Sequence, residues 1–459
     1  MTLTLFAFLR RAMRALPGAL GVLALAAPAH AGGAAPPPAA AGWVTAWESP
    51  GQSIPQGAQV PTYRKAPALR DQTLRQLIVP ELSGRELRVR ISNRWSDTAL
   101  RIDAASIGAA RRGAGVWPAT LRTLYFAGRT QVVVAPHGVV WSDVTQEPVR
   151  AGRALAVSLY LASSVVPRGW HRWGGQVQFV SALGNHVDDA GGGAFPGRLT
   201  SYLWLDRVDV LPRTPSAALV AIGDSITDGM RSRLDARQSW PQQLGALLRA
   251  RGVHDLAVLN AGISGNRLLA DSACWGEALR RRFARDALQV AGVRAVIVLI
   301  GINDIEFGYT PQRRGLDCDA PHLRPDAAQL EQALQLLARQ AHARGVRLYA
   351  ATLTPADLPA ARESLRLQLN RWIRHSPEFD GVVDFDAALR DPRHPSRLRA
   401  RFDSGDHEHP SDAGYAAMAR AALGVAVREA AWSSASQLRA SASSASSTGA
   451  SCSPRGVSP

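Results

Sequence analysis

The pattern of apolar and polar positions changes character near residue 212. Up to that point, from residue 43 to about 211, short runs of alternating apolar and polar residues recur between Gly, Pro and Asp turns, as at 86–92 and 154–160. Alternation with a period of two is typical of strands that bury one face. Residues 43–211 are therefore predicted to form a β-rich accessory domain of the β-sandwich or jelly-roll type.

Beyond residue 216 the pattern becomes one of apolar strands alternating with amphipathic helices. Strands are predicted at 219–223, 257–262, 295–301, 346–353 and 382–385. Helices are predicted near 239–251, 277–290, 326–344 and 358–374, and a last one, capped by Ser411, through 428. This alternation indicates an α/β domain over 217–430, with a parallel sheet covered on both faces.

The two ends of the chain have compositions that predict no packed domain. Residues 1–31 combine three arginines, an apolar run of about 14 residues and the cleavage pattern Ala29-His30-Ala31. A signal peptide cleaved near Ala31 is expected, and hence a secreted or periplasmic protein. The apolar run is shorter than the ~20 residues that span a bilayer, so no stable membrane insertion is expected. Residues 32–42 read as a flexible leader, and the Ser/Ala-rich residues 433–459 as a disordered tail.

Charge alone does not point to a nucleic-acid partner. The formal net charge is +16, but the cations are scattered arginines, and Lys65 is the only lysine. A nucleic-acid-binding surface needs basic residues gathered on one face, so solvated surface charge is the preferred interpretation. The sequence leaves the oligomeric state open.

A serine follows the first strand of the α/β domain in the run Gly223-Asp224-Ser225-Ile226. In an open parallel sheet, ligands bind beyond the carboxyl ends of the strands, which is where this serine lies. Its own backbone N–H could face a substrate oxyanion. Taken alone, Gly-Asp-Ser fits an ordinary turn or helix cap equally well.

The segment Asp406-His407-Glu408-His409 offers a base that could activate Ser225. A serine hydroxyl is a weak nucleophile without a base, and Asp406, three residues before His409, could orient that imidazole. His407 is a rival base, and Asp403 a rival orienting carboxylate. A metal site is a further alternative, but adjacent ligands fit poorly around one ion, so we expect neither a metal nor another cofactor.

Two further loops at strand ends offer donors for an oxyanion. Gly265 follows the second strand and Asn303 the third, and their backbone N–H and side-chain amide could act beside the Ser225 N–H. Asp224 and Asp304 are interpreted as residues that structure these loops.

In this order, Ser225, Gly265, Asn303 and the Asp406/His409 pair resemble the four motif blocks of the SGNH hydrolases, also called the GDSL esterase/lipase superfamily. The resemblance covers about 219–428, and Ile226 replaces the usual Leu. It implies a flavodoxin-like fold with five parallel strands and a Ser-His-Asp acyl-enzyme mechanism. The run at 262–269 is most similar to a secreted subgroup of arylesterases and acylhydrolases linked with plant-polysaccharide breakdown.

The resemblance implies a carboxylic ester hydrolase. We expect small acyl groups, above all acetyl, on carbohydrate or aryl alcohols, with a small molecule or a polysaccharide ester as substrate. Two alternatives remain open: a lipase or thioesterase for longer acyl chains, and a catalytically silent carbohydrate-binding protein.

Cysteines and tryptophans add two structural expectations. Cys274 and Cys318 follow the second and third strands, whose ends meet at one sheet edge, so a disulfide between them is predicted, with Cys452 free. Eight tryptophans of the β-rich region could line a carbohydrate platform, although core packing is the preferred interpretation. The segment 169–174 is the best candidate in that region for a loop that reaches another surface.

Overall fold

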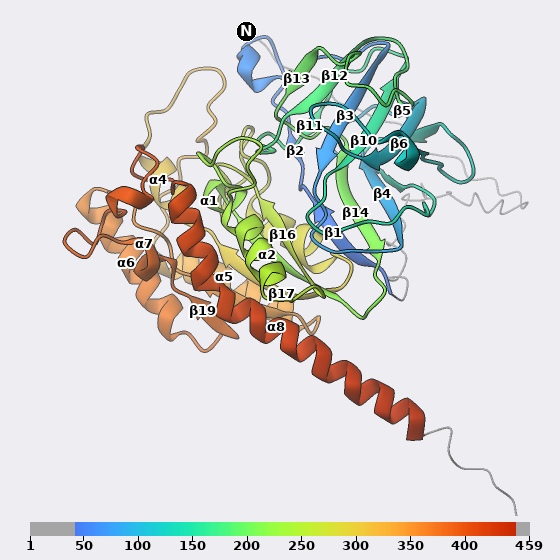
Figure 1. The fold of residues 1–459 in the computed structure, drawn as a ribbon. Coiled ribbons are helices and arrows are strands. Elements are labelled where there is room, and N and C mark those ends of the chain that lie inside the picture. The colour runs from blue at the N-terminus through green and yellow to red at the C-terminus, as the bar shows by residue number, and fades with distance from the viewer. Residues whose placement is uncertain (1–41, 447–459) are drawn as a thin grey trace, which may run out of the picture. The chain divides into compact units, whose positions relative to one another are not determined.

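A single parallel sheet organises the carboxyl-terminal half of the protein. In the computed structural model, which describes residues 42–446, its strands are β15 (Ala217–Gly223), β16 (Leu256–Gly262), β17 (Val293–Leu299), β18 (Arg347–Ala351) and β19 (Gly381–Val383). They pair in the order β16-β15-β17-β18-β19, all parallel. The predicted flavodoxin-like sheet is confirmed (Figure 1).

Helices bury this sheet on both faces, since every residue of β15 is buried. The α-helices are α1 (Ser225–Asp228), α2 (Trp240–Ala250), α3 (Leu279–Phe283), α4 (Ile302–Glu306), α5 (Ala327–His342), α6 (Ala360–His375), α7 (Phe385–Leu389) and α8 (Asp412–Ser446). Shorter turns are the 3-10 helices η1 (Thr62–Arg64), η2 (Pro118–Thr120), η4 (Phe307–Tyr309) and η5 (Ala400–Phe402), and the π-helix η3 (Ala284–Leu288).

Local chemistry explains why α5 begins and packs where it does. The Asp326 side chain accepts a hydrogen bond from the Gln329 N–H, and the Gln329 side chain in turn accepts from the Asp326 N–H. This capping box satisfies two backbone donors that a helix start otherwise leaves unpaired. Leu330, Leu334 and Leu337 recur at helical spacing and are buried.

The last helix is longer than the sequence predicted. A helix was expected through about residue 428, and α8 runs from Asp412 to Ser446 (red in Figure 1). The disordered tail expected at 433–459 stays a prediction. Alanine has the highest helix propensity, and adding residues to an existing helix needs no new nucleus, so a Ser/Ala-rich sequence can extend it. The predicted signal peptide, most of the predicted leader, residues 447–459 and Cys452 lie outside the described residues.

The amino-terminal region consists of antiparallel sheets, as predicted. Its strands are β1 (Val44–Glu48), β2 (Gln52–Ser53), β3 (Gln72–Ile78), β4 (Glu86–Ser92), β5 (Leu100–Ile102), β6 (Ala104–Ala109), β7 (Arg122–Thr123), β8 (Val132–Val134), β9 (Val139–Trp141), β10 (Leu155–Leu161), β11 (Gly169–Trp170), β12 (Gln178–Leu183), β13 (Gly197–Leu199) and β14 (Leu205–Leu211). The larger sheets have the orders β1-β14-β4-β9 and β13-β12-β3-β10-β6-β7, and β2/β11 and β5/β8 form two pairs.

In strand β4, apolar and charged residues alternate and lie on opposite faces of the sheet. Leu87, Val89 and Ile91 have no exposed surface and point into the core, whereas the arginines between them lie on the other face. There Arg88 and Arg90 pair with two carboxylates of the neighbouring strand β14. The period of two therefore separates the core from a cross-strand ion-pair ladder.

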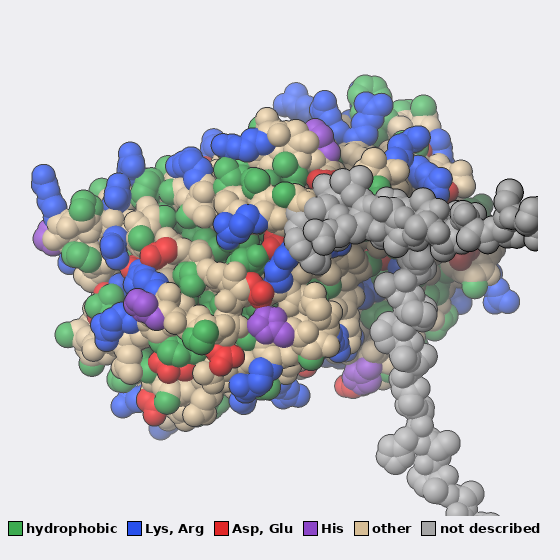
Figure 2. Space-filling view, turned by 90° about the horizontal axis from the view of Figure 1, so that it is seen from below, with side chains coloured by type: hydrophobic (Ala, Val, Ile, Leu, Met, Phe, Trp, Pro, Cys, Tyr) green, Lys and Arg blue, Asp and Glu red, His purple; other side chains and the backbone are tan. Residues whose placement is uncertain are grey.

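One hydrophobic core joins the two regions, from Val44 to Ala430. Strand β1 contributes directly, because the Thr45 N–H donates to the Ala291 carbonyl at 3.0 Å and the Ala291 N–H to Thr45 Oγ1 at 3.2 Å. On the face drawn in Figure 2, Lys and Arg side chains are scattered among other types. None of the helices between residues 42 and 446 combines the length and apolar character needed to span a bilayer.

Candidate active site

Ser225 lies at the point where strand β15 gives way to the short helix α1. The side chain of Asp224 caps that helix by accepting a hydrogen bond from the Ile226 N–H at 3.0 Å. The cap fixes the turn at the carboxyl edge of the sheet, where the strand order changes direction. Ser225 itself is only 5% exposed.

His409 meets Ser225 across a separation of 184 residues. Its Nε2 lies 2.8 Å from Ser225 Oγ, and its Nδ1 lies 2.9 Å from Oδ2 of Asp406. In this arrangement the carboxylate accepts the Nδ1 proton, which leaves Nε2 free to accept the proton of the serine hydroxyl. The geometry is that of a nucleophile, a base and an orienting acid.

The protonation states suit these positions. Burial lowers the pKa of His409, and Arg231 lowers it further, against the opposing effect of Asp406, so the imidazole is neutral at pH 7. Although burial alone would raise it, hydrogen bonds from the backbone and from the His409 ring hold the pKa of Asp406 far below its usual range. The carboxylate is therefore ionised, and it also accepts from Arg231 Nε at 2.9 Å.

The rival residues of the same loop pair with each other instead. His407 Nδ1 lies 2.6 Å from Oδ2 of Asp403, and the His407 side chain is 67% exposed. This carboxylate is the only described hydrogen-bond partner of the His407 ring. The histidine that contacts the Ser225 hydroxyl is therefore His409. Geometry thus separates the two histidines, which sequence reasoning left as alternatives.

Ser225, Gly265 and Asn303 line one cavity of about 460 Å³, together with Asp406 and His409. Gly265 has φ +76°, and a Cβ there would lie 2.3 Å from the Trp275 ring, so both conformation and space require glycine. Asn303 is buried, and one of its amide hydrogens is bound by the Asn266 carbonyl at 3.0 Å. The other amide hydrogen remains for a substrate oxygen.

Asp304 and Asp228 hold the Gly265 loop in place. The carboxylate of Asp304 accepts the backbone N–H groups of Leu268 and Leu269 at 2.7 and 2.9 Å. Asp228 Oδ2 accepts both the N–H and the hydroxyl of Ser264, the residue next to Gly265, at 3.0 and 2.6 Å. Asp224 and Asp304 thus structure loops, and Asp228 does the same without having been singled out.

A buried arginine ties the strand ends together beneath the site. Arg282 has no exposed side-chain surface and donates to the carbonyls of Gly223 and Ala261, the ends of β15 and β16, at 2.8 and 3.0 Å. It also donates to Asn266 Oδ1 at 2.9 Å and pairs with Asp286 at 3.4 Å. The sequence signal was misleading, because a run of three arginines at 280–282 looks like surface charge.

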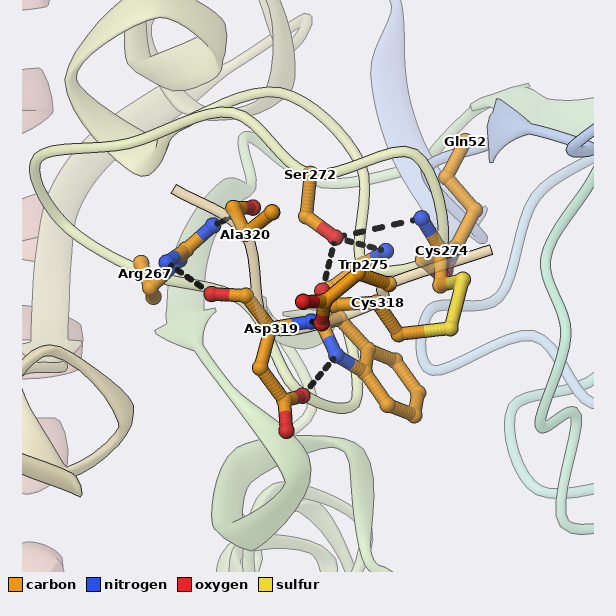
Figure 3. The surroundings of a disulfide bond; sticks show 9 residues. Gln52, Arg267, Ser272, Cys274, Trp275, Cys318, Asp319 and Ala320 are labelled. Atoms are coloured by element: carbon orange, nitrogen blue, oxygen red, sulfur yellow. Dashed lines mark hydrogen bonds between the residues drawn. A yellow bond between two sulfur atoms is a disulfide. The ribbon is translucent and has the colours of Figure 1, made fainter. Parts of the chain in front are cut away.

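Cys274 and Cys318 form a disulfide that links the loops after the second and third strands (Figure 3). The Ser272 hydroxyl donates to the Cys318 carbonyl and accepts from the N–H groups of Cys274 and Trp275. The Trp275 indole N–H donates to Asp319 at 3.3 Å. The linked loops hold the Trp275 ring against the cavity.

The β-rich region also reaches the cavity, through the segment 169–174. Arg172 and Trp173 line it, together with Trp275, Phe307 and Glu408, and sequence reasoning assigned none of these five to the site. Of the eight tryptophans, Trp117 is 54% exposed, whereas Trp170 and Trp204 are 6% and 7% exposed and the others partly buried. Packing therefore accounts for most of them.

Residues 221–417 match the model of the GDSL-like Lipase/Acylhydrolase family, so the family predicted from the sequence is confirmed for this part of the chain. Similar solved structures include a GDSL-like lipase from Bacteroides thetaiotaomicron, at 16% identity over 46% of this chain and 88% of that one, with a TM-score of 0.32. An alpha/beta hydrolase enzyme from the metagenome of Lake Arreo has 24% identity over 46% and 95%, with a TM-score of 0.35. A variant of an acetyl xylan esterase from Geobacillus stearothermophilus has 23% identity over 47% and 95%, with a TM-score of 0.34. The curated proteins yield no significant match.

Proposed function

Because residues 221–417 form a GDSL-like lipase/acylhydrolase domain, a carboxylic ester hydrolase, we propose that the protein is an exported serine esterase for small acyl esters of carbohydrate or aryl alcohols. Ser225 is its nucleophile, His409 its general base and acid, and Asp406 the residue that orients His409. The observation that carries the proposal is the 2.8 Å contact between Ser225 Oγ and His409 Nε2.

Acylation begins when Ser225 Oγ attacks the ester carbonyl carbon and His409 Nε2 takes the hydroxyl proton. The carbonyl oxygen becomes an oxyanion, which the Ser225 N–H, the Gly265 N–H and the Asn303 amide stabilise. When the tetrahedral intermediate collapses, His409 returns the proton to the leaving alcohol. A water molecule, deprotonated by His409, then attacks the acyl-enzyme and releases the acid and free Ser225.

The size and lining of the cavity support small acyl groups. Its volume of about 460 Å³ lies within the range typical of small-molecule sites, and its lining includes both polar or charged residues and aromatic ones. A p-nitrophenyl ester series from acetate to decanoate tests this point. The highest kcat/KM at acetate or propionate supports it, whereas a maximum at octanoate or longer would favour the lipase alternative.

The disulfide supports export. Disulfides persist in oxidising compartments and are rare in the cytosol, so the Cys274–Cys318 link fits a protein that leaves the cytoplasm behind a cleaved leader. The intact mass of protein isolated from the periplasm or the medium should correspond to a chain that begins near Gly32. Retention of Met1 in that fraction would contradict cleavage.

The decisive experiment on the chemistry compares wild type with Ser225→Ala on p-nitrophenyl acetate, with binding of a substrate analogue as a check on folding. We expect kcat to fall by roughly a thousandfold or more. Equal rates would refute Ser225 as the nucleophile. Acetylated xylan, pectin and mannan, compared side by side by acetate release, then identify the natural alcohol.

A further inference from the structure

The Trp275 ring forms a fixed wall of the cavity. The disulfide, the Ser272 hydroxyl and Asp319 hold its backbone and indole N–H, as Figure 3 shows. Its ring carbons also lie against Gly265, since a Cβ at that glycine would be 2.3 Å away. A group that lies on this ring is therefore close to the proposed oxyanion loop.

Two arginines from the β-rich region lie over this ring. The Arg64 guanidinium carbon is 4.1 Å from the ring centroid, and that of Arg172 is 5.8 Å from it. Arg64 ends the 3-10 helix η1, whereas Arg172 follows strand β11 and lines the cavity. More than one hundred residues separate them in sequence, yet they share one aromatic surface.

These two cations have no carboxylate partner in the part of the chain that the structure describes. Nε and Nη1 of Arg64 are buried without a hydrogen-bond partner there, and the Arg172 guanidinium forms no ion pair. Burial lowers the pKa of Arg64, and the like charge of Arg172 lowers it further. Two partly desolvated like charges are unfavourable unless an anion joins them.

The other charged groups of the cavity do not neutralise them. Asp228 already pairs with His171, and Asp406 with His409 and Arg231. Asp319, which accepts the Trp275 indole N–H, attracts Arg64 but forms no ion pair with it among the described residues. Burial, with help from Glu306 and Asp224, raises the pKa of Glu408 to about 8, so it is largely uncharged at pH 7. The part of the cavity wall that Arg172 and Trp275 form, with Arg64 on the same ring, is thus left with a net positive charge.

We propose that Arg172, which lies over Trp275 and lines the cavity, binds a carboxylate of the ester substrate, and that the charge of Arg64 on the same ring strengthens this binding, so that the enzyme prefers acidic esters to neutral ones of the same shape. This inference rests on the proposed esterase function and names its substrate class. A guanidinium that stacks through its face keeps its N–H groups for hydrogen bonds in its plane, and their fork matches a carboxylate.

Two matched substrate pairs test the preference in wild-type enzyme. For a carboxylate on the alcohol side, m-acetoxybenzoate is compared with neutral m-acetoxybenzamide; for one on the acyl side, the mono-p-nitrophenyl ester of adipic acid is compared with p-nitrophenyl hexanoate. We expect kcat/KM to favour the acidic member of at least one pair by roughly tenfold or more. The preference should shrink when NaCl is raised from about 20 mM to about 500 mM.

Arg64→Gln and Arg172→Gln show whether these residues cause the preference. Each should lower the ratio of kcat/KM for the acidic ester to kcat/KM for the neutral ester by about tenfold. Arg172→Lys should retain part of the preference, because it keeps the charge and loses the fork. Arg112→Gln, an exposed arginine of the same region, is the matched control and should change neither substrate.

The possible outcomes separate this inference from the proposed function. If wild type hydrolyses neither member of any pair, or Ser225→Ala is as fast as wild type, the esterase proposal fails. If wild type hydrolyses neutral esters through Ser225 but shows no preference for the acidic partners, only the present inference fails. If a glutamine variant does not fold, the inference is tested by the preference of the wild-type enzyme for acidic esters and by the salt dependence of that preference.

Discussion

The Nε2 atom of His171 lies 3.2 Å from Oδ1 of Asp228, a buried contact between the β-rich region and the helix that begins with Ser225. The same ring contacts two carbonyl oxygens, those of Pro50 and Trp173, each at 2.9 Å. Every partner is an acceptor, so both ring nitrogens donate and the imidazole is a cation. Asp228 in turn holds Ser264, which connects the β-rich region to the loop of Gly265.

This contact predicts a pH-dependent stability. Burial alone lowers the pKa of His171, but Asp228 and the two carbonyls outweigh it and raise the pKa above its ordinary value of 6.5. A raised folded-state pKa adds stability that is complete below the unfolded pKa and is lost as the pH rises through the folded one. The Tm difference between wild type and His171→Gln should be largest near pH 6 and should narrow at higher pH.

Thermal denaturation between about pH 5.5 and pH 9 measures this difference. His375→Gln, which alters an exposed histidine, is the control and should give a small difference at every pH. Parallel Tm curves for wild type and His171→Gln would show that His171 does not titrate on unfolding.

Substitution of His409 and substitution of His407 should have very different effects on kcat. His409→Ala removes the base that contacts Ser225, and kcat should fall by roughly a thousandfold or more. His407→Ala removes a side chain bound to Asp403, and kcat should change by less than about threefold. Steady-state kinetics on p-nitrophenyl acetate compares the two, and the reverse order would exchange their roles.

Arg231 should affect the pH dependence of kcat/KM. Because burial and Arg231 lower the pKa of His409, kcat/KM of the wild type should rise on an acid limb centred below pH 6.5. Arg231→Gln removes one of these effects, so the limb should move to higher pH. Arg233→Gln, which alters a nearby arginine paired with Asp412, should leave the limb in place. An unmoved limb in Arg231→Gln would separate Arg231 from the titration of His409.

Arg282 should matter for stability more than any surface arginine. Arg282→Met removes the buried donor that Asn266 Oδ1 and the carbonyls of Gly223 and Ala261 share, and leaves Asp286 paired with Arg285 alone, so it should cost about 3–5 kcal/mol of unfolding free energy. Arg281→Met removes an adjacent cation whose side chain is 61% exposed and should change it by less than about 1 kcal/mol. Thermal and urea denaturation of both variants checks the contrast, and equal losses would refute the structural role.

The sequence predicted the sheet and the pairing of Ser225 with His409 from two different signals. The alternation of apolar strands with amphipathic helices indicated a parallel sheet, with Ser225 at its carboxyl edge. The spacing of Asp406 and His409 and the order of the motifs paired that serine with a base 184 residues away. Contacts between the two regions, such as His171 with Asp228 or Arg64 with Trp275, follow no periodicity and depend on how the regions pack. The role of Arg282 could not be predicted for a related reason, because its partners, two backbone carbonyls and the side chains of Asn266 and Asp286, come together only in the folded chain.

The shared core, which runs from Val44 to Ala430, limits how this enzyme can be recombined. An enzyme engineer who excised the α/β half as a free-standing catalyst would expose the surface that β1 covers and would also remove Arg172 and His171. Grafting a foreign binding module onto residue 217 would meet the same obstacle. Substrate range in this protein is therefore more accessible through point changes at Arg64 and Arg172 than through exchange of whole segments.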